Sequence, residues 1–403
     1  MINPKVKLNH MQEVAVEMYA DYYRYPHKRK RPWFEINGAA GTGKTTVIRE
    51  AMEYLGIDNE LTAFMAYVGK ATLALRMNGL NAKTIHSTIY DLVLGYARDE
   101  YGEYILDAKG NKILRHQFEL KPFLEPNYQQ LVIDEGGMVG AGIGQDILSY
   151  HKPTMVLGDL AQLPPVMAKR IFLEAPDVTL TEIMRQEKDS PIIYLSQKAK
   201  MGEPIKYGIY GSRECMVIPK RLLTDEMLAE ADIVICETNM MRDNINRYMR
   251  KNIQGIEEPY IVPGDKLVCR QNKWTTVLDE DVSLVNGLIG YVQNTYKESK
   301  HGNRCLMDID FRPEFYKSKH FKKIGIDHKN PFLPYNERKE KKTFGGDSPA
   351  IFEFANCITC HLSQGSQYDT VLVYVEHGGN SLYFKQWLYT AITRAKKKLI
   401  LVI

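Results

Sequence analysis

The sequence lacks the marks of a membrane-bound, exported or disulfide-rich protein. No run of apolar residues approaches the roughly 18 that a membrane-spanning helix needs. The first residues, Met1–Lys5, do not open a signal peptide, and the six cysteines are scattered, as expected of a reduced cytosolic protein. The net charge of +4 is too small to indicate a nucleic-acid partner by itself. We expect the 403 residues to form two or three soluble domains with no membrane partner.

One glycine-rich stretch has the pattern of a phosphate-binding loop. Residues 38–45 read GAAGTGKT and fit G-x-x-x-x-G-K-[ST], with a strand pattern before them and a helical pattern after them. The backbone N–H groups of such a loop and the N-terminus of the following helix favour a bound triphosphate. Lys44 would reach the β- and γ-phosphates, and the Thr45 hydroxyl would ligate Mg²⁺. The candidate nucleotide contacts are Gly38, Ala39, Ala40, Gly41, Thr42, Gly43, Lys44, Thr45 and Thr46.

Two acidic residues follow an apolar strand pattern, which is the second motif that a nucleotide triphosphatase requires. Residues 131–133 are apolar and lead directly into Asp134 and Glu135. Asp134 would hold Mg²⁺ through water, and Glu135 would accept the proton of the attacking water. Three more side chains are candidates for sensing the γ-phosphate or neutralising its charge, namely Gln162, Arg185 and Arg394.

The N-terminal segment contains a residue with two alternative roles. Residues 5–25 have the apolar spacing of a helix, with Asn9 as the expected N-cap and Gln12 three positions later. Gln12 is either the partner of Asn9 in a capping box or an amide that pairs with the adenine edge of a nucleotide. The spacing favours neither role over the other.

Three polar residues occupy places where an α/β sheet presents side chains to a ligand. Lys70 opens a helix after a buried strand, at the edge of a parallel sheet where ligands bind. Thr84 and His86 begin the next segment and offer hydroxyl and imidazole groups of the kind that contact phosphates. Each is a weak indication in isolation, because a lysine at a helix start more often lies on the surface.

Strand and helix patterns alternate along the chain in two series, which predicts an α/β fold. The first series carries the phosphate loop, and the second begins near residue 190 without such a loop. This pattern suggests two related lobes with the nucleotide between them. We expect the first lobe over 1–89 and 128–189, and the second over 190–290 and 356–403.

Two stretches interrupt these series and are interpreted as insertions. The first, 90–127, is expected to form a hairpin in which 101–106 pairs with 112–118, as a surface decoration or as a working element. The second, 291–355, holds ten basic and four acidic residues between positions 312 and 342, interleaved with aromatic side chains. That composition suits either a channel in which rings stack on the bases of a single strand or a small lysine-rich β-module.

Taken in order, these motifs resemble those of superfamily 1 helicases. The resemblance rests on GAAGTGKT at 38–45, TIHS at 84–87, Asp134-Glu135, GDLAQLPP at 158–165, SQG at 363–365 and TAITR at 390–394. The set is most similar to the RecD/Dda branch, which moves 5′ to 3′ on DNA, and within it to the Dda-like enzymes of phages. Two departures are Gly136-Gly137, where the family usually has a small residue and then serine, and 66–70, which lacks the usual Pro-Thr before Gly-Lys.

The resemblance implies a fold, a chemistry and partners. The fold is two RecA-like P-loop lobes, with a wedge hairpin in the first and a small SH3-like β insertion in the second. The activity is unwinding of forked duplex DNA, driven by ATP and Mg²⁺, by an enzyme that moves 5′ to 3′ on single-stranded DNA. The setting is the bacterial cytoplasm, alongside replication or recombination proteins such as a single-strand-binding protein. Gln12 and Gly365 fall at nucleotide positions, and the strand-contacting positions are Lys70, Thr84, His86, Thr359 and His361.

Three other functions fit the same motifs. A translocase or recombination-complex subunit would walk on DNA without separating strands alone. An RNA helicase of the same superfamily would be activated by RNA rather than by DNA. An ATP-gated nucleic-acid clamp would have negligible turnover, and the complete set of Lys44, Glu135 and Arg394 argues against it.

Overall fold

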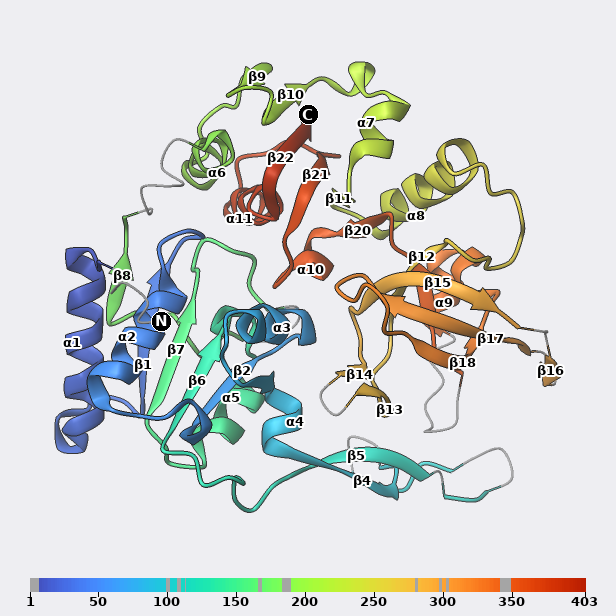
Figure 1. Cartoon of the computed structure of the whole chain (residues 1–403). Coiled ribbons are helices and arrows are strands. Elements are labelled where there is room, and N and C mark those ends of the chain that lie inside the picture. The colour runs from blue at the N-terminus through green and yellow to red at the C-terminus, as the bar shows by residue number, and fades with distance from the viewer. Residues whose placement is uncertain are drawn as a thin grey trace. The chain divides into compact units, whose positions relative to one another are not determined.

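The computed structural model describes residues 7–98, 102–106, 110–112, 114–165, 169–182, 190–279, 282–296, 299–301, 304–340 and 349–403. Internal contacts divide the chain into two units. Unit 1 comprises 1–89, 122–222 and 363–403, and unit 2 comprises 90–121 and 223–362. Unit 1 contains residues from both the N-terminal and the C-terminal parts of the chain. In Figure 1 the strands of one of its sheets are therefore blue and green, whereas strands β21 and β22 of another sheet are red.

Unit 1 contains a parallel sheet built from the buried apolar runs of the sequence. Its six strands lie in the order β3-β2-β6-β7-β1-β8, and every neighbouring pair is parallel. The strands of a sheet that is covered on both faces are apolar along their whole length, and every residue of β2 and β7 is buried. The predicted α/β class is confirmed. The strands are β1 (Trp33–Gly38), β2 (Thr62–Ala66), β3 (Ala82–Thr84), β6 (Gln130–Asp134), β7 (Thr154–Gly158) and β8 (Val178–Leu180).

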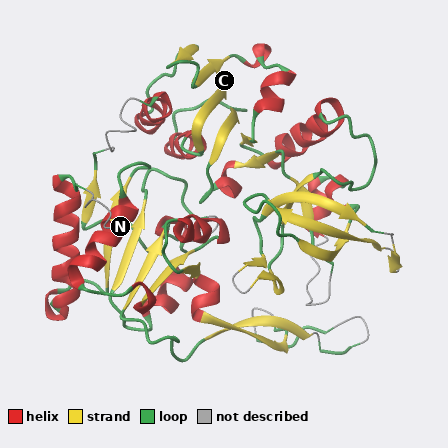
Figure 2. Ribbon diagram, in the orientation of Figure 1, coloured by secondary structure: helices red, strands yellow, loops and turns green. Residues whose placement is uncertain are grey.

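Helices accompany this sheet, as the red and yellow elements of Figure 2 show. The core packs Tyr19 of α1 and Ile48 of α2 against Phe34 and Ile36 of β1. The predicted N-terminal helix is confirmed over His10–Arg24. Nowhere in the described ranges does a helix combine the length and the apolar character needed to cross a membrane. The helices are α1 (His10–Arg24), α2 (Lys44–Leu55), α3 (Gly69–Met77), α4 (Ile85–Ile89), η3 (Gly136–Met138) and α5 (Ala141–Leu148).

Unit 1 also contains a second set of parallel strands, as the second βα series predicts. Strand β22 (Ala395–Val402) pairs in parallel with β10 (Cys215–Ile218) and with β21 (Tyr368–Tyr374). A short strand, β9 (Gly208–Tyr210), adds to β10 in the antiparallel sense. Helix α11 (Leu382–Ile392) packs against α6 (Pro191–Met201) and connects β21 to β22.

Unit 2 combines a hairpin, a parallel strand pair and an antiparallel sheet. In the pair, β11 (Ile233–Cys236) lies parallel to β20 (Cys357–Thr359), and α7 (Asp225–Glu230) and α8 (Asn239–Tyr248) flank β11 in the sequence. The antiparallel sheet has the order β16-β17-β15-β12-β19, with β18 on β17. Its strands are β12 (Lys266–Cys269), β15 (Ile289–Thr295), β16 (Ser299–His301), β17 (Arg304–Pro313), β18 (Phe321–Asp327) and β19 (Phe352–Phe354). Unit 2 also contains the paired strands β13 (Lys273–Asp279) and β14 (Val282–Leu284), and the helices α9 (Tyr335–Glu340) and α10 (Cys360–Ser363).

The hairpin is present, but the predicted pairing of 101–106 with 112–118 is wrong. Strand β4 (Tyr90–Tyr96) pairs with β5 (Leu114–Leu120), so that Tyr96 faces Leu114. Beyond that pair, isolated bridges join Arg98 to Tyr104 and Leu106 to Lys112 among the described residues of the tip. The reason is that the residues directly after α4 are rich in tyrosine, leucine and valine, which favour a strand.

Lys266–Cys269 is a strand, as predicted, but it does not belong to the second βα series. It pairs in the antiparallel sense with β15 and with β19. Leu267 and Cys269 accordingly point into the core of the antiparallel sheet, together with Phe311 and Phe352. The apolar run by itself did not show which sheet it would join.

Candidate functional site

The loop predicted to bind phosphate joins β1 to α2, as its motif requires. Gly41 and Gly43 both have φ of +78°, a conformation that glycine adopts without steric penalty. Position 43 also has no room for a side chain, because a Cβ there would lie 2.3 Å from Nε2 of Gln12. The two glycines therefore give the loop a bend that lets its backbone N–H groups surround a phosphate.

Gln12 caps α1 and contacts this loop at the same time. Its Oε1 accepts the Asn9 N–H at 3.0 Å, and Oδ1 of Asn9 accepts the Gln12 N–H at 2.9 Å, which is the predicted capping box. Its Nε2 donates to the carbonyl oxygen of Thr42 at 3.0 Å. The capping role is thus present, and the buried amide also lies against the phosphate loop. A contact with adenine stays a prediction.

Lys44 lies close enough to Asp134 and Glu135 for its charge to affect the pKa of both carboxyl groups. Its Nζ donates to the carbonyl oxygens of Gly38 at 2.7 Å and Ala39 at 3.2 Å. Its positive charge lowers the pKa of Asp134 and of Glu135. The structure therefore brings the lysine of the first motif and the carboxyl groups of the second into one site.

Burial is the largest influence on these two carboxyl groups. Desolvation raises the pKa of Asp134 above its usual 3.8 and that of Glu135 above its usual 4.5. The charge of Asp134 raises the pKa of Glu135 further. A carboxyl group with a raised pKa at the end of a strand suits the role of a general base, as predicted for Glu135.

The backbone of Glu135 is held in an uncommon conformation. Its φ of +52° lies in the left-handed region, which costs a residue with a side chain roughly 1–3 kcal/mol. The Glu135 N–H donates to Oδ1 of Asp134 at 2.9 Å, which helps to fix the turn. Strain of this kind gathers at functional sites, so the conformation supports a role for this carboxyl group.

The donor set fits Mg²⁺. In nucleotide sites this ion takes one or two carboxylates, with waters and phosphate oxygens completing its shell. Asp134 supplies a half-buried carboxylate, and Thr45 supplies a hydroxyl in the first turn of α2. The described residues contain no group of three His, Cys, Asp or Glu side chains that could hold a metal ion, so a cage made by the protein alone is not available there.

The loop after β7 carries Gln162, which is buried. Oδ1 of Asp159 accepts the Ala161 N–H at 3.0 Å, and the Leu160 N–H donates to Oδ1 of Asn37 at 2.9 Å. Asn37 belongs to β1, directly before the phosphate loop. These bonds hold the 159–163 segment beside that loop, which is where a residue that senses the γ-phosphate must lie.

Arg394 lies in the same unit as the phosphate loop and acts on Glu135. It is 3% exposed, and its charge lowers the pKa of Glu135. Its Nε donates to the Thr390 carbonyl oxygen at 3.0 Å, and Nη1 donates to that of Ser366 at 3.1 Å. This interaction places Arg394 near Glu135, and the predicted contact of Arg394 with the γ-phosphate stays a prediction.

Gly365 and the Gly136-Gly137 pair have distinct steric surroundings. Gly365 has φ of +70°, and a Cβ there would lie 2.7 Å from Cγ2 of Val68, just before α3. At Gly136 a Cβ would lie 2.3 Å from Cγ1 of Val156, so no side chain fits. At Gly137 the nearest atom would be 3.7 Å away, which leaves room for the serine that the family usually has.

The predicted strand-contacting residues are divided between the two units. In unit 1, Oγ1 of Thr84 donates to Oγ of Ser87 at 2.9 Å, and His86 lies edge-on to Tyr67 with ring centroids 5.8 Å apart. Burial lowers the pKa of His86 and of His361. Lys70 is in the first turn of α3 in unit 1. In unit 2, Thr359 is the last residue of β20, and His361 lies in α10. Arg185 lies outside the described residues.

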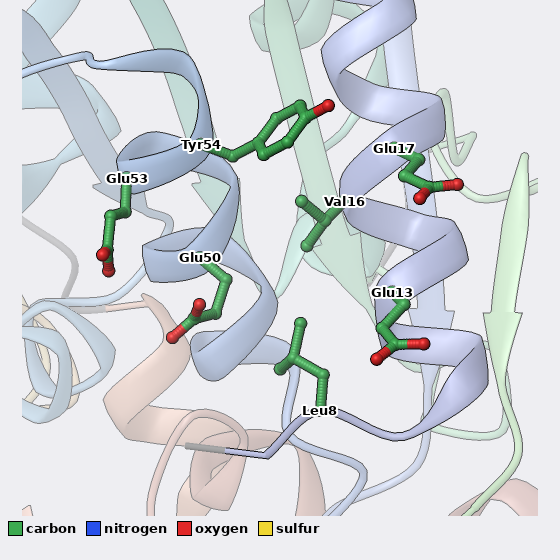
Figure 3. A pocket seen from close by; sticks show the side chains of 7 residues that line it. All are labelled: Leu8, Glu13, Val16, Glu17, Glu50, Glu53 and Tyr54. Atoms are coloured by element: carbon green, nitrogen blue, oxygen red, sulfur yellow. The ribbon is translucent and has the colours of Figure 1, made fainter. Parts of the chain in front are cut away.

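A cleft elsewhere in unit 1 does not suit a nucleotide. It has a volume of about 430 Å³ and lies between α1 and α2, lined by Leu8, Glu13, Val16, Glu17, Glu50, Glu53 and Tyr54. Figure 3 shows its four glutamates on the two facing helices. Carboxylates would repel a triphosphate, so the phosphate loop remains the candidate nucleotide site.

The sequence interpretation missed a tyrosine that joins these parts. Tyr389 donates to Oδ2 of Asp159 at 2.5 Å, and the Leu163 N–H donates to Oγ1 of Thr390 at 3.0 Å. Both α11 residues precede Arg394 in the TAITR motif region. A tyrosine and a threonine a few residues before a predicted catalytic arginine were the available signal.

Two protein families match the chain. The AAA domain family matches residues 20–216, and the UvrD-like helicase C-terminal domain family matches residues 354–402. The chain is 24% identical to an uncharacterized protein of Methanocaldococcus jannaschii, over 91% of this chain and 36% of the relative. It is 25% identical to the ATP-dependent RecD2 DNA helicase of Deinococcus radiodurans, over 90% of this chain and 46% of that protein. The chain thus spans less than half the length of these two relatives.

Solved Pif1 helicases share the fold. A structure that addresses DNA unwinding at forked double-stranded DNA by two coordinating Pif1 helicases matches with a TM-score of 0.54 and 17% identity, covering 99% of this chain and 92% of that one. Bacteroides Pif1 bound to single-stranded DNA matches with a TM-score of 0.53 and 16% identity, covering 99% and 93%. The fold is therefore α/β with RecA-like domains, as predicted.

The match to the UvrD-like helicase C-terminal domain family, the similarity to a RecD2 DNA helicase and the fold shared with Pif1 helicases agree with the resemblance of the motifs to superfamily 1 helicases. The RecD/Dda branch and a Dda-like position within it stay predictions.

Proposed function

We propose that this chain is an ATP-dependent DNA helicase that moves 5′ to 3′ along single-stranded DNA and unwinds the duplex ahead of it. The observation that carries the proposal concerns the carboxyl group of Glu135. Burial raises its pKa, and the positive charges of Lys44 and Arg394 both oppose that rise. One cation belongs to the phosphate loop, and the other follows α11 near the other end of the chain. A triphosphate at the loop would therefore be held from both sides.

The proposed roles follow from this geometry and from the family resemblance. Lys44 would bind the β- and γ-phosphates, and Glu135 would accept the proton of the attacking water. Thr45 and Asp134 would hold Mg²⁺, which when bound neutralises phosphate charge. Gln162, Arg185 and Arg394 would respond to the γ-phosphate, and Gln12 and Gly365 would complete the nucleotide contacts.

Movement would come from a change in population between two arrangements of the lobes. Contacts to the γ-phosphate favour the closed arrangement, and their loss after hydrolysis favours the open one. The residues that would grip the strand are Lys70, Thr84, His86, Thr359 and His361. The hairpin β4–β5 would act as the wedge, and the module within 291–355 as an SH3-like element. The resemblance supports a Dda-like enzyme in the bacterial cytoplasm, acting beside replication or recombination proteins.

Unwinding of matched duplexes with a 5′ or a 3′ single-stranded tail tests activity and direction together. We expect the 5′-tailed duplex to be unwound and the 3′-tailed one to persist. Lys44→Ala should abolish strand-stimulated ATP hydrolysis and retain single-strand binding. Preference for the 3′ tail would overturn the direction. Hydrolysis without unwinding would favour a translocase, stronger activation by RNA an RNA helicase, and no phosphate release a clamp.

A further inference from the structure

The hydroxyl group of Tyr389 lies between two loops of the proposed hydrolytic site. It donates a 2.5 Å hydrogen bond to Oδ2 of Asp159, and it lies near the backbone of Ala40. Ala40 belongs to the phosphate loop, and Asp159 begins the segment that carries Gln162. The side chain of Tyr389 is 1% exposed and extends from α11. The phenol thus joins α11 to the 159–163 segment by a hydrogen bond and lies near the phosphate loop.

Three more hydrogen bonds hold the 159–163 segment to the C-terminal part of unit 1. The Leu163 N–H donates to Oγ1 of Thr390 at 3.0 Å, and the Leu163 carbonyl oxygen accepts Nε2 of Gln364 at 2.9 Å. Nε2 of Gln386 donates to the Leu160 carbonyl oxygen at 3.3 Å. Arg394 follows α11 directly, so these contacts also fix where the arginine lies.

The hydrogen bond between the Tyr389 phenol and the Asp159 carboxylate is suited to fixing the position of α11 relative to the 159–163 segment. Burial raises the pKa of Tyr389, and the charge of Asp159 raises it further, so the phenol keeps its proton and remains the donor. Oδ1 of Asp159 is itself oriented by the Ala161 N–H at 3.0 Å. A hydrogen bond to an ionised group is short and strong compared with a neutral one, so it favours one placement of α11.

On the basis of the proposed function, we propose that Tyr389 is a positioning residue whose hydroxyl sets α11, and with it Arg394, against the phosphate loop. Ala40 is part of the loop that surrounds the phosphates and lies near the phenol. A shift of this loop on nucleotide binding would therefore alter the position of the Tyr389 side chain, and with it the position of α11. Removing the hydroxyl should therefore slow hydrolysis while nucleotide binding at Lys44 persists.

Tyr389→Phe removes the hydroxyl and keeps the buried ring. We expect kcat for strand-stimulated ATP hydrolysis to fall about 10- to 100-fold, the scale of a hydrogen bond to a charged group, with little change in KM for ATP. Tyr19→Phe is the matched control, because Tyr19 is a buried tyrosine of unit 1 whose hydroxyl donates to Oε1 of Gln130 at 2.5 Å. That control should change neither constant. In combination with Asp159→Asn, the effect of Tyr389→Phe should shrink, since both changes remove the same bond.

Hydrogen exchange of α11 provides a second measurement that needs no turnover. A non-hydrolysable ATP analogue should slow exchange of α11 in the unaltered chain and in Tyr19→Phe, but not in Tyr389→Phe. The proposal is overturned if α11 is equally protected in Tyr389→Phe, if the unaltered chain shows no protection, or if kcat matches that of Tyr19→Phe. Protection that depends on Tyr389 in a protein that unwinds nothing would refute the helicase function alone.

Discussion

Nε2 of Gln12 donates to the carbonyl oxygen of Thr42, while Oε1 of the same side chain accepts the N–H of Asn9, each at 3.0 Å. One amide therefore joins the cap of α1 to the phosphate loop through two different atoms. Gln12→Glu keeps an acceptor for Asn9 but places a second oxygen against the Thr42 carbonyl. We expect KM for ATP to rise about tenfold, the scale of one lost hydrogen bond.

Gln12→Ala is the companion variant, because it removes both contacts. It should raise KM similarly and also lower the melting temperature, since the capping box is lost. ATPase titrations and thermal unfolding of the two variants measure the two roles separately. An unchanged KM in Gln12→Glu would show that the loop contact has no part in nucleotide binding.

Glu135→Gln tests the assignment of the general base. The amide is similar in size to the carboxyl group but cannot accept the proton, so hydrolysis should slow at least about a hundredfold. Binding of a fluorescent ATP analogue should persist, because the loop and Lys44 are unaltered. Phosphate release at saturating single-stranded DNA is the measurement. A rate close to that of the unaltered chain would move the base to another residue.

Gly136 and Gly137 are neighbours that should respond differently to the same change. A Cβ at 136 would lie 2.3 Å from Cγ1 of Val156 and 3.3 Å from the backbone oxygen of Leu157, so Gly136→Ala should cost about 1–3 kcal/mol of unfolding free energy. At 137 the nearest atom is Cδ1 of Leu173 at 3.7 Å, so Gly137→Ala should be nearly neutral. Urea unfolding of both variants makes the comparison, and equal losses would contradict the packing around η3.

The phosphate loop and the acidic pair could be predicted because each depends on a short stretch of sequence. Glycines at 41 and 43 and a lysine at 44 specify a turn and a charge locally, and the apolar run before Asp134 specifies a buried strand. The interaction of Arg394 with Glu135 was not predicted, because the sequence offered Arg394 only as a contact for the γ-phosphate.

Pairings between distant segments could not be predicted in the same way. The bond from Tyr389 to Asp159 joins residues 230 positions apart, and each residue has an ordinary neighbourhood in the sequence. Likewise, the run Lys266–Cys269 indicates a buried strand but not its partners, which are set by the packing of the antiparallel core. The register of the hairpin was predicted wrongly for a related reason. Several pairings of its apolar residues satisfy the same alternation of apolar and polar positions.

His86 should make stability depend on pH. Burial lowers its pKa from the usual 6.5, so the unfolded chain binds a proton at a pH where the folded chain does not. Its contribution to stability is therefore complete above pH 6.5 and is lost as the pH falls below that value. The midpoint of urea unfolding should drop between pH 7.5 and 5.5, and His86→Gln should reduce the drop. An exposed-histidine variant, His10→Gln, is the control, and an equal drop in all three proteins would contradict this account.

The tip of the hairpin is the part that the proposed wedge requires. Beyond the Tyr96–Leu114 pair, Nη2 of Arg98 donates to the Tyr104 hydroxyl at 2.6 Å, and Nζ of Lys112 lies 3.7 Å from the centroid of the Tyr104 ring. These contacts hold two cations beside an exposed aromatic ring. A ring held in this way can stack on a base pair at a fork, and the cations can offset phosphate charge.

Replacing 97–113 with Asn-Gly removes that tip and joins Tyr96 to Leu114 by a two-residue turn, which suits strands that already face each other there. Strand-stimulated ATP hydrolysis should persist, because no residue of the nucleotide site is altered. Unwinding of a 5′-tailed duplex should slow at least about tenfold, the scale of opening one base-pair step without assistance. The Tyr104→Phe variant keeps the aromatic ring beside Arg98 and Lys112, so it should unwind the duplex at the normal rate. A shortened protein that unwinds as fast as the unaltered chain would show that strand separation occurs elsewhere on the molecule.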